Sequence, residues 1–126
     1  MKPGKILVVE DEAAIRWLIV DLLAEAGFEI VEFDRGEAAL PLLDKIRPHL
    51  LLTDINMPGR VDGIALADSA RMIHPALPVI FITGRPEAAV RARKLPGPSE
   101  VLLKPFAFSN LLTTLRRLVG EAQLNG

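Results

Sequence analysis

The sequence predicts an α/β fold in which one parallel β-sheet is covered by helices on both faces. Short apolar runs that do not alternate with polar residues, such as 50–53 and 79–82, are typical of strands buried on both faces. Segments with apolar residues at helical spacing separate these runs, and most connections need only two to six residues. Five strands alternating with five helices imply right-handed crossovers and parallel pairing.

The first half of the chain supplies three of the strands and two of the helices. Pro41 falls inside the second helix, where proline removes a hydrogen bond and clashes with the preceding turn, so we expect a kink or a late start there. Met57-Pro58-Gly59 ends the third strand, because proline cannot extend a ladder and glycine lets the backbone turn. The expected elements are a strand at 5–10, a helix at 12–26 closed by Gly27, a strand at 28–33, a helix at 35–47 and a strand at 50–54.

The second half supplies two strands and three helices. Asp62 is a good N-cap for the third helix, and Pro86 suits the first turn of a short fourth helix. The expected elements are a helix through 64–73, a strand at 77–83, a helix from 86 to about 94 ended by Leu95-Pro96-Gly97-Pro98, a strand at 100–103 and an amphipathic helix with Gly120 near its end.

Composition excludes several classes of protein. The 126 residues suffice for one domain, and a half-hydrophobic, quarter-charged chain with mean hydropathy +0.31 is neither disordered nor fibrous. The absence of cysteine excludes disulfides, thiolate metal sites and thiol catalysis. No apolar run reaches the roughly 18 residues of a transmembrane helix, and no signal-peptide pattern occurs. We therefore expect a cytoplasmic protein with no membrane association.

Charge is unevenly distributed although the net charge is only −1. Residues 1–63 hold 7 Lys and Arg against 12 Asp and Glu, whereas residues 64–126 hold 8 against 4. This pattern fits either ordinary solvated helix faces or an acidic site followed by a basic contact surface. The overall balance argues against direct nucleic-acid binding, which favours a strongly basic domain.

Residues suited to chemistry lie at the ends of four strands: Glu10 and Asp11, Asp54, Thr83, and Lys104. In a doubly wound sheet of strand order 2-1-3-4-5, these ends meet at one edge, with the first and third strands adjacent. Three neighbouring carboxylates repel one another unless a cation is present, and all-oxygen ligation suits Mg²⁺. A lysine and a threonine hydroxyl could then hold an anion.

This combination predicts phosphoryl transfer to a carboxylate, with Asp54 as the best nucleophile. Each feature alone has an ordinary explanation. The acids at 10–12 could complement a helix dipole, Thr83-Gly84 could be a turn, and a Lys-Pro pair is common. Their joint placement at the correct strand ends favours a site.

The sequence resembles the receiver domain of two-component response regulators over about residues 4–120. The resemblance rests on the motifs Ile6-Leu7-Val8-Val9-Glu10-Asp11-Glu12, Thr53-Asp54-Ile55-Asn56-Met57-Pro58-Gly59 with Asp62-Gly63, Ile82-Thr83-Gly84 and Leu103-Lys104-Pro105-Phe106. It implies a flavodoxin-like doubly wound (βα)5 fold. It also implies that Asp54 accepts a phosphoryl group from a phosphohistidine of a histidine kinase or phosphotransfer protein.

The resemblance also implies roles for the neighbouring residues. Asp11, Asp54 and the Asn56 backbone carbonyl would ligate Mg²⁺ (or Mn²⁺), with Glu10 helping through water. Thr83 would close onto the phosphoryl oxygens and Lys104 would pair with them. Asn56 and Arg85 would tune the lifetime of the phosphoryl aspartate, and the peptide bond before Pro105 would be cis.

Two features depart from the family pattern. Val101 occupies the position where receivers commonly carry a tyrosine or phenylalanine, and valine has no ring to swing inward. The loop 58–63 is one residue longer than the common form. Together with the short fourth helix, these departures suggest a remodelled output surface.

We therefore expect one receiver domain over residues 1–126, without an effector domain, that catalyses its own phosphorylation and slow dephosphorylation. Its downstream protein target or second copy would bind the face formed by residues 86–118. Alternatives are a phosphorylation-independent binding module, a receiver fragment of a longer transcriptional regulator, and an aspartyl-phosphate phosphatase of similar fold. The last class uses a second acid two residues after its nucleophile, where this chain has Asn56.

Overall fold

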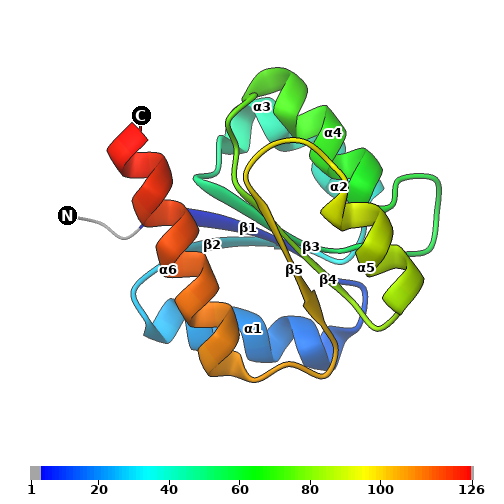
Figure 1. The fold of residues 1–126 in the computed structure, drawn as a ribbon, viewed down its shortest axis with the longest axis horizontal. Coiled ribbons are helices and arrows are strands. Elements are labelled where there is room, and N and C mark those ends of the chain that lie inside the picture. The colour runs from blue at the N-terminus through cyan, green and yellow to red at the C-terminus, as the bar shows by residue number, and fades with distance from the viewer. Residues whose placement is uncertain (1–3, 126) are drawn as a thin grey trace.

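A five-stranded parallel sheet forms the centre of the protein in the computed structural model, which describes the chain over residues 4–125 and its side chains to residue 120 (Figure 1). The strand order is β2-β1-β3-β4-β5, which confirms the predicted doubly wound topology. The strands are β1 (Lys5–Val9), β2 (Glu29–Phe33), β3 (Leu50–Asp54), β4 (Val79–Thr83) and β5 (Ser99–Leu103).

Helices cover both faces of this sheet (Figure 1). Helices α1 and α6 pack on one face and the remaining helices on the other. The helical elements are α1 (Ala13–Glu25), α2 (Gly36–Ala39), the 3-10 turn η1 (Leu40–Leu42), α3 (Leu43–Ile46), α4 (Gly63–Ile73), α5 (Pro86–Arg93) and α6 (Phe108–Asn125). Within residues 4–125, no helix combines the length and the apolar character needed to cross a membrane.

Local chemistry explains how these helices begin and break. The predicted helix at 35–47 is divided into α2, η1 and α3 around Pro41, which confirms the expected interruption. Helix α4 begins at its predicted cap, because the Asp62 side chain accepts a hydrogen bond from the Ala65 amide at 2.8 Å. Helix α5 is short, as Pro96 and Pro98 predict.

Burial distinguishes the central strands from the edge strands. Every residue of β3 and β4 is buried, whereas β5 is half-buried and exposed at its last residue. The central strands therefore have apolar cover on both faces, which accounts for their lack of alternation.

The register of the sheet brings the functional strand ends together. Val9 pairs with Thr53, so Glu10, which follows β1, and Asp54, which ends β3, also lie beside each other. Asp54 pairs with Ile82, and the Lys104 amide donates to the Thr83 carbonyl at 2.8 Å. The carboxyl ends of β1, β3, β4 and β5 thus form one edge, where ligands bind in open α/β sheets.

Candidate functional site

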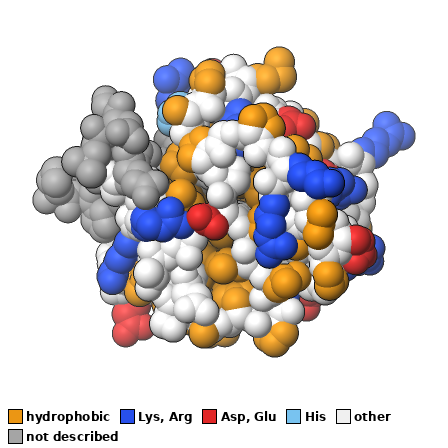
Figure 2. Space-filling view, viewed as in Figure 1, with side chains coloured by type: hydrophobic (Ala, Val, Ile, Leu, Met, Phe, Trp, Pro, Cys, Tyr) orange, Lys and Arg blue, Asp and Glu red, His pale blue; other side chains and the backbone are white. Residues whose placement is uncertain are grey.

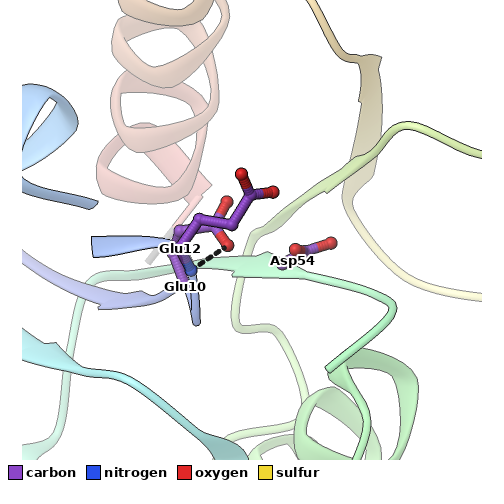
Figure 3. A group of neighbouring side chains, drawn as sticks. All are labelled: Glu10, Glu12 and Asp54. Atoms are coloured by element: carbon purple, nitrogen blue, oxygen red, sulfur yellow. Dashed lines mark hydrogen bonds between the residues drawn. The ribbon is translucent and has the colours of Figure 1, made fainter. Parts of the chain in front are cut away.

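Three carboxylates meet at the carboxyl edge of the sheet. Glu10 and Glu12 follow β1, and Asp54 ends β3 (Figure 3). Each offers an oxygen, and these oxygens all lie within 4.8 Å of one another. Glu10 and Asp54 are 0% and 4% exposed, so two of the three negative charges are withdrawn from water. Like charges at this spacing require a cation.

Lys104 supplies that positive charge. Its ammonium nitrogen lies 2.7 Å from Glu10 Oε1, 3.1 Å from Asp54 Oδ2 and 3.3 Å from Glu12 Oε1. The lysine follows β5 and precedes Pro105, and the peptide bond between them is cis. A single ammonium therefore neutralises part of an acidic group contributed by two other strands.

Burial and pairing displace the proton equilibria of this group. Burial raises the pKa of Glu10 to about 7, and the neighbouring Asp54 adds to the rise although Lys104 opposes it. For Lys104, burial alone lowers the pKa, but its interactions with Glu10 and Asp54 outweigh burial and raise the pKa overall. The lysine consequently stays charged at neutral pH while Glu10 titrates there.

One oxygen of Glu10 is incompletely satisfied. Oε1 lies close enough to Lys104 for an ion pair, yet among the described residues it is buried without a hydrogen bond of acceptable geometry. Oε2 accepts from the Glu12 amide at 3.2 Å. A buried oxygen whose contact with a lysine is an ion pair without good hydrogen-bond geometry is suited to a metal ion or to its bound water, and an all-oxygen donor set suits Mg²⁺.

Thr83 and Asn56 form the other side of the site. The buried Thr83 hydroxyl donates to Asn56 Oδ1 at 2.9 Å and accepts from the Arg85 amide at 3.1 Å. The Asn56 backbone N–H donates to Asp54 Oδ1 at 3.3 Å. This chain of hydrogen bonds connects the end of β4 to the carboxylate of β3 and fixes the direction of the hydroxyl.

Most of the residues expected at the site lie there, but the acidic group includes one that the sequence did not single out. Glu12 belongs to the cluster, whereas Asp11 does not. The backbone at Glu12 is extended, and residues two apart in an extended chain point to the same side. The Glu12 side chain therefore lies on the same side of the chain as that of Glu10. The run of three acids was the available signal for this arrangement. Val101 is half-buried in β5 and packs against the core.

Two clefts of different character flank the site. One is apolar, has a volume of about 500 Å³ and lies between α1 and the start of α6; Glu12 and Lys104 are at its margin, and its walls include Ile15, Leu18 and Phe106. The other is polar, has a volume of about 470 Å³ and is lined by Asn56, Arg60 and Arg85 among others. The carboxylates therefore lie between an apolar surface and a cationic one.

Comparison with known proteins agrees with this geometry. The response regulator receiver domain family matches residues 6–116, and the chain belongs to this family. The chain is a receiver domain of the kind found in two-component response regulators, whose members interact with histidine kinases and downstream targets and bind Mg²⁺ at an acidic pocket.

Individual relatives show how widely the domain is used. The chain is 37% identical to the DNA-binding transcriptional regulator NtrC of Salmonella typhimurium over 125 residues, covering 98% of this chain but 26% of NtrC. It is 37% identical to the response regulator receiver protein CpdR of Brucella abortus, covering 91% of this chain and 96% of CpdR. A receiver protein structure from Sinorhizobium medicae superposes with a TM-score of 0.86 at 28% identity, covering 94% of this chain and 95% of that one. The chain thus spans about a quarter of NtrC and nearly all of CpdR.

Proposed function

We propose that this domain takes a phosphoryl group from a phosphohistidine onto Asp54 in a Mg²⁺-dependent reaction and thereby switches a protein-interaction surface. The domain would act in the cytoplasm, and the donor would be a histidine kinase or phosphotransfer protein. The observation that carries the proposal is the position of Lys104, 3.1 Å from the buried carboxylate of Asp54 and 2.7 Å from Glu10. A nucleophile, a cation and an unsatisfied buried oxygen occupy one strand-end cluster.

The all-oxygen donor set at this edge fits the expected metal ion. Asp11, whose carboxylate lies outside the group formed by Glu10, Glu12 and Asp54, would turn toward Asp54 and hold Mg²⁺ together with Asp54 and the Asn56 backbone carbonyl. Glu10 would contribute through a bound water. The unsatisfied Glu10 oxygen supports this assignment. When bound, the ion would offset the negative charges of Asp54 and the incoming phosphoryl group. Glu12, which also lies within ion-pair distance of Lys104, would be released to solvent, where its side chain is already 60% exposed.

The chemical step would use the side chains around Asp54. An oxygen of Asp54 attacks phosphorus while the phosphorus–nitrogen bond of the phosphohistidine breaks and its electron pair returns to the imidazole. Lys104 then moves its hydrogen bond from the carboxylate to a phosphoryl oxygen. The Thr83 hydroxyl, which now donates to Asn56, rotates to donate to another phosphoryl oxygen. Each of these shifts stabilises charge on the transferred group.

Thr83 connects the reaction to the proposed output face, which comprises residues 86–118 on α5, β5 and α6. Thr83 pairs with Leu103 across β4 and β5, and its hydroxyl anchors the residue before α5. Figure 2 shows basic side chains gathered over this side of the molecule with apolar side chains between them. The exposed cations of the face are Arg91, Arg93, Lys94, Arg116 and Arg117. An acidic surface of a partner, or of a second copy, would complement them.

Two alternatives make different predictions. A phosphatase of similar fold would need an acid at position 56 and would turn over phosphoesters, whereas this chain has Asn56 hydrogen-bonded to Thr83. A phosphorylation-independent binding module would not need a charged lysine among buried carboxylates. The intact Glu10, Asp54, Thr83 and Lys104 set favours phosphorylation over both.

Intact-protein mass spectrometry tests the proposal. We expect the wild-type protein to gain one phosphoryl mass after incubation with phosphoramidate and Mg²⁺, and the Asp54→Asn variant to gain none. Chelation of the metal should abolish the gain. If the wild-type protein stays unmodified while a known receiver is modified in parallel, phosphorylation-independent binding becomes the better account.

A further inference from the structure

Arg16 on α1 reaches back to the backbone of Glu10, the residue that follows β1. Its Nη1 donates to the Glu10 carbonyl at 2.8 Å, and its Nε donates to Glu32 Oε1 on β2 at 3.2 Å. The arginine side chain is only 14% exposed, so its guanidinium is held largely out of solvent. Arg16 thus joins α1, the end of β1 and the edge strand β2 at the carboxyl edge of the sheet.

The carbonyl that Arg16 holds belongs to the peptide bond between Glu10 and Asp11. A peptide bond is planar, so fixing its oxygen restricts backbone rotation on either side and thereby the directions of both side chains. The other polar groups around this point are occupied as well. The Glu10 amide donates to the Phe33 carbonyl at 3.1 Å, and Glu10 Oε2 accepts from the Glu12 amide at 3.2 Å. Arg16 therefore completes the contacts that orient the acidic turn at 10–12.

The environment of Glu10 makes this contact hard to replace. Glu10 is fully buried, and among the described residues only Arg16 donates a hydrogen bond to its carbonyl. Without the guanidinium, a buried acceptor would be left without its donor. The peptide would then be free to rotate toward another donor, whereas Asp54 stays in place because it ends the buried strand β3. The spacing between the acids of the turn and Asp54 therefore depends on Arg16.

We propose that Arg16 is a positioning residue for the metal site, because it orients the peptide from which the Glu10 and Asp11 side chains reach a cation bound beside Asp54. This inference rests on the proposed function, since it assumes that Mg²⁺ binds among these acids. Arg16 acts through the backbone, because its guanidinium donates to the Glu10 carbonyl and not to a carboxylate of the cluster. Removing a partner that orients metal ligands from outside the coordination sphere commonly weakens metal binding roughly 10–100-fold.

The charge of Arg16 and its position predict opposite effects on metal affinity. A cation near an acidic site repels Mg²⁺, so charge alone predicts that removal of Arg16 tightens metal binding. Loss of the orienting hydrogen bond predicts weaker binding. Arginine suits the positioning role because its planar guanidinium donates in fixed directions to two acceptors at once, whereas a lysine ammonium is a point charge on a flexible stem. The direction of the change in metal affinity therefore decides between the two effects.

Lys5 provides a matched control at the other end of the same two strands. Its ammonium donates to the Ile46 carbonyl at 3.0 Å and lies 3.5 Å from Glu29 Oε2 on β2, so it also joins a backbone carbonyl to an acid of the edge strand. Lys5 begins β1, so the contact lies at the edge of the sheet opposite the acidic cluster. Lys5→Met should destabilise the protein in urea as Arg16→Gln does, but leave its metal affinity unchanged.

Metal affinity is measured on the metal-free, unphosphorylated protein by NMR, following the backbone amides of residues 10–12 and 56 during titration with magnesium chloride. We expect Arg16→Gln to raise the Mg²⁺ dissociation constant about tenfold. Arg16→Lys keeps the charge and most of the stem, so it should fold even if Arg16→Gln does not, and it should bind Mg²⁺ less tightly than the wild-type protein. With phosphoramidate as donor, the Mg²⁺ concentration for half-maximal phosphorylation of Arg16→Gln should rise by the same factor, and the rate at saturating Mg²⁺ should stay at the wild-type value.

Several results would overturn the inference. Unchanged or tighter Mg²⁺ binding in Arg16→Gln would reduce Arg16 to a structural contact or a charge, and wild-type affinity in Arg16→Lys would do the same if only that variant folds. Equal weakening in Lys5→Met would show that any loosening of β1 and β2 disturbs the site. A lower rate at saturating Mg²⁺ with unchanged half-saturation would assign Arg16 to the chemical step instead.

Failure of the proposed function is distinguishable from failure of this inference. A wild-type protein whose amides do not respond to Mg²⁺ would refute the metal dependence of the proposed function, and the inference would fall with it. A wild-type protein that binds Mg²⁺ as tightly as its Arg16 variants would leave the proposed function standing and refute the positioning role alone.

Discussion

The carboxyl edge of the sheet and the face formed by α5, β5 and α6 are adjacent, but they are built differently. At the edge, Glu10 and Thr83 are 0% exposed and Asp54 is 4% exposed, and each has polar contacts with its neighbours. On the face, Val90 and Leu103 are 50% and 39% exposed, and β5, which ends at Leu103, is only half-buried. The edge is assembled within the chain, whereas the face leaves apolar and basic groups open to solvent.

This difference predicts how the two regions respond to change. Substitutions at the edge disturb buried charges and hydrogen bonds, so they should alter stability and chemistry together. Substitutions on the face remove solvated groups, so they should leave stability and chemistry nearly unchanged and alter only association with a partner. The following predictions test this contrast in order of decreasing effect on the free energy of unfolding.

Removal of the Lys104 ammonium should have the largest effect. In Lys104→Met, the carboxylates of Glu10 and Asp54 would lose the cation that lies within 3.1 Å of both. Breaking a buried ion pair from one side costs about 4 kcal/mol. We expect a loss of that size above pH 7 in urea unfolding of the metal-free protein.

Addition of Mg²⁺ should restore much of the stability lost by Lys104→Met, because a cation that binds only the folded state stabilises it. Adding Asp54→Asn to this variant should also recover stability, since one of the unpaired charges is removed. An equal loss with and without Mg²⁺ would show that packing, rather than charge, determines the role of Lys104.

Titration of Glu10 should be the next largest effect. Its pKa rises from an ordinary value of 4.5 to about 7 in the folded protein, mainly through burial. The folded state therefore binds a proton that the unfolded state has released between pH 4.5 and 7, so the free energy of unfolding falls as pH rises through that window. Deprotonation of Glu10 lowers the free energy of unfolding by about 3 kcal/mol in total, and this loss is complete above pH 7.

Urea titrations of the metal-free protein across this pH range measure the Glu10 effect, with Glu10→Gln as the reference. The difference in stability between the two proteins should change over pH 4.5–7, because Lys104, whose pKa is raised, stays charged throughout. Parallel profiles would mean that Glu10 titrates normally and that the edge is more hydrated than its burial indicates.

Asn56 should contribute a smaller effect through Thr83. In Asn56→Ala, the buried hydroxyl loses the acceptor that lies 2.9 Å away, which costs about 1 kcal/mol. A double-mutant cycle with Thr83→Val measures this coupling, and Asn110→Ala in α6 is an exposed control. Additive losses from the two substitutions would show that the Thr83–Asn56 hydrogen bond does not contribute to stability.

Sequence predicted the edge well because strand order and register determine it. Once Asp54, Thr83 and Lys104 fall at the ends of apolar runs, a parallel sheet must bring them together, and the pairings of Val9 with Thr53 and Thr83 with Leu103 do so. Pro41 likewise interrupted its helix as proline chemistry requires. These features follow from backbone rules.

Side-chain choices within the edge could not be predicted in the same way. The contact of Lys104 with Glu12, the place of Glu12 in the cluster instead of Asp11, and the hydrogen bond from Thr83 to Asn56 depend on rotamers set by several elements. The anchoring of the longer loop by Glu37 joins residues 24 positions apart, and no local pattern indicates it. Such contacts need the assembled fold.

The face should respond least in stability and most selectively in function. Arg116 is exposed and Arg117 forms a partly exposed ion pair with Glu100 at 2.6 Å, so reversing both charges should cost at most about 1 kcal/mol. We expect Arg116→Glu with Arg117→Glu to keep the wild-type rate of phosphorylation at Asp54, measured by mass, and to weaken association with a partner or a second copy, measured by light scattering or titration of the phosphorylated form. Arg35→Glu with Lys45→Glu changes the same total charge outside this face and should leave association intact. If the Arg116 and Arg117 reversals reduced phosphorylation as much as association, the edge and the face would not be separable, and the contrast between them would be wrong.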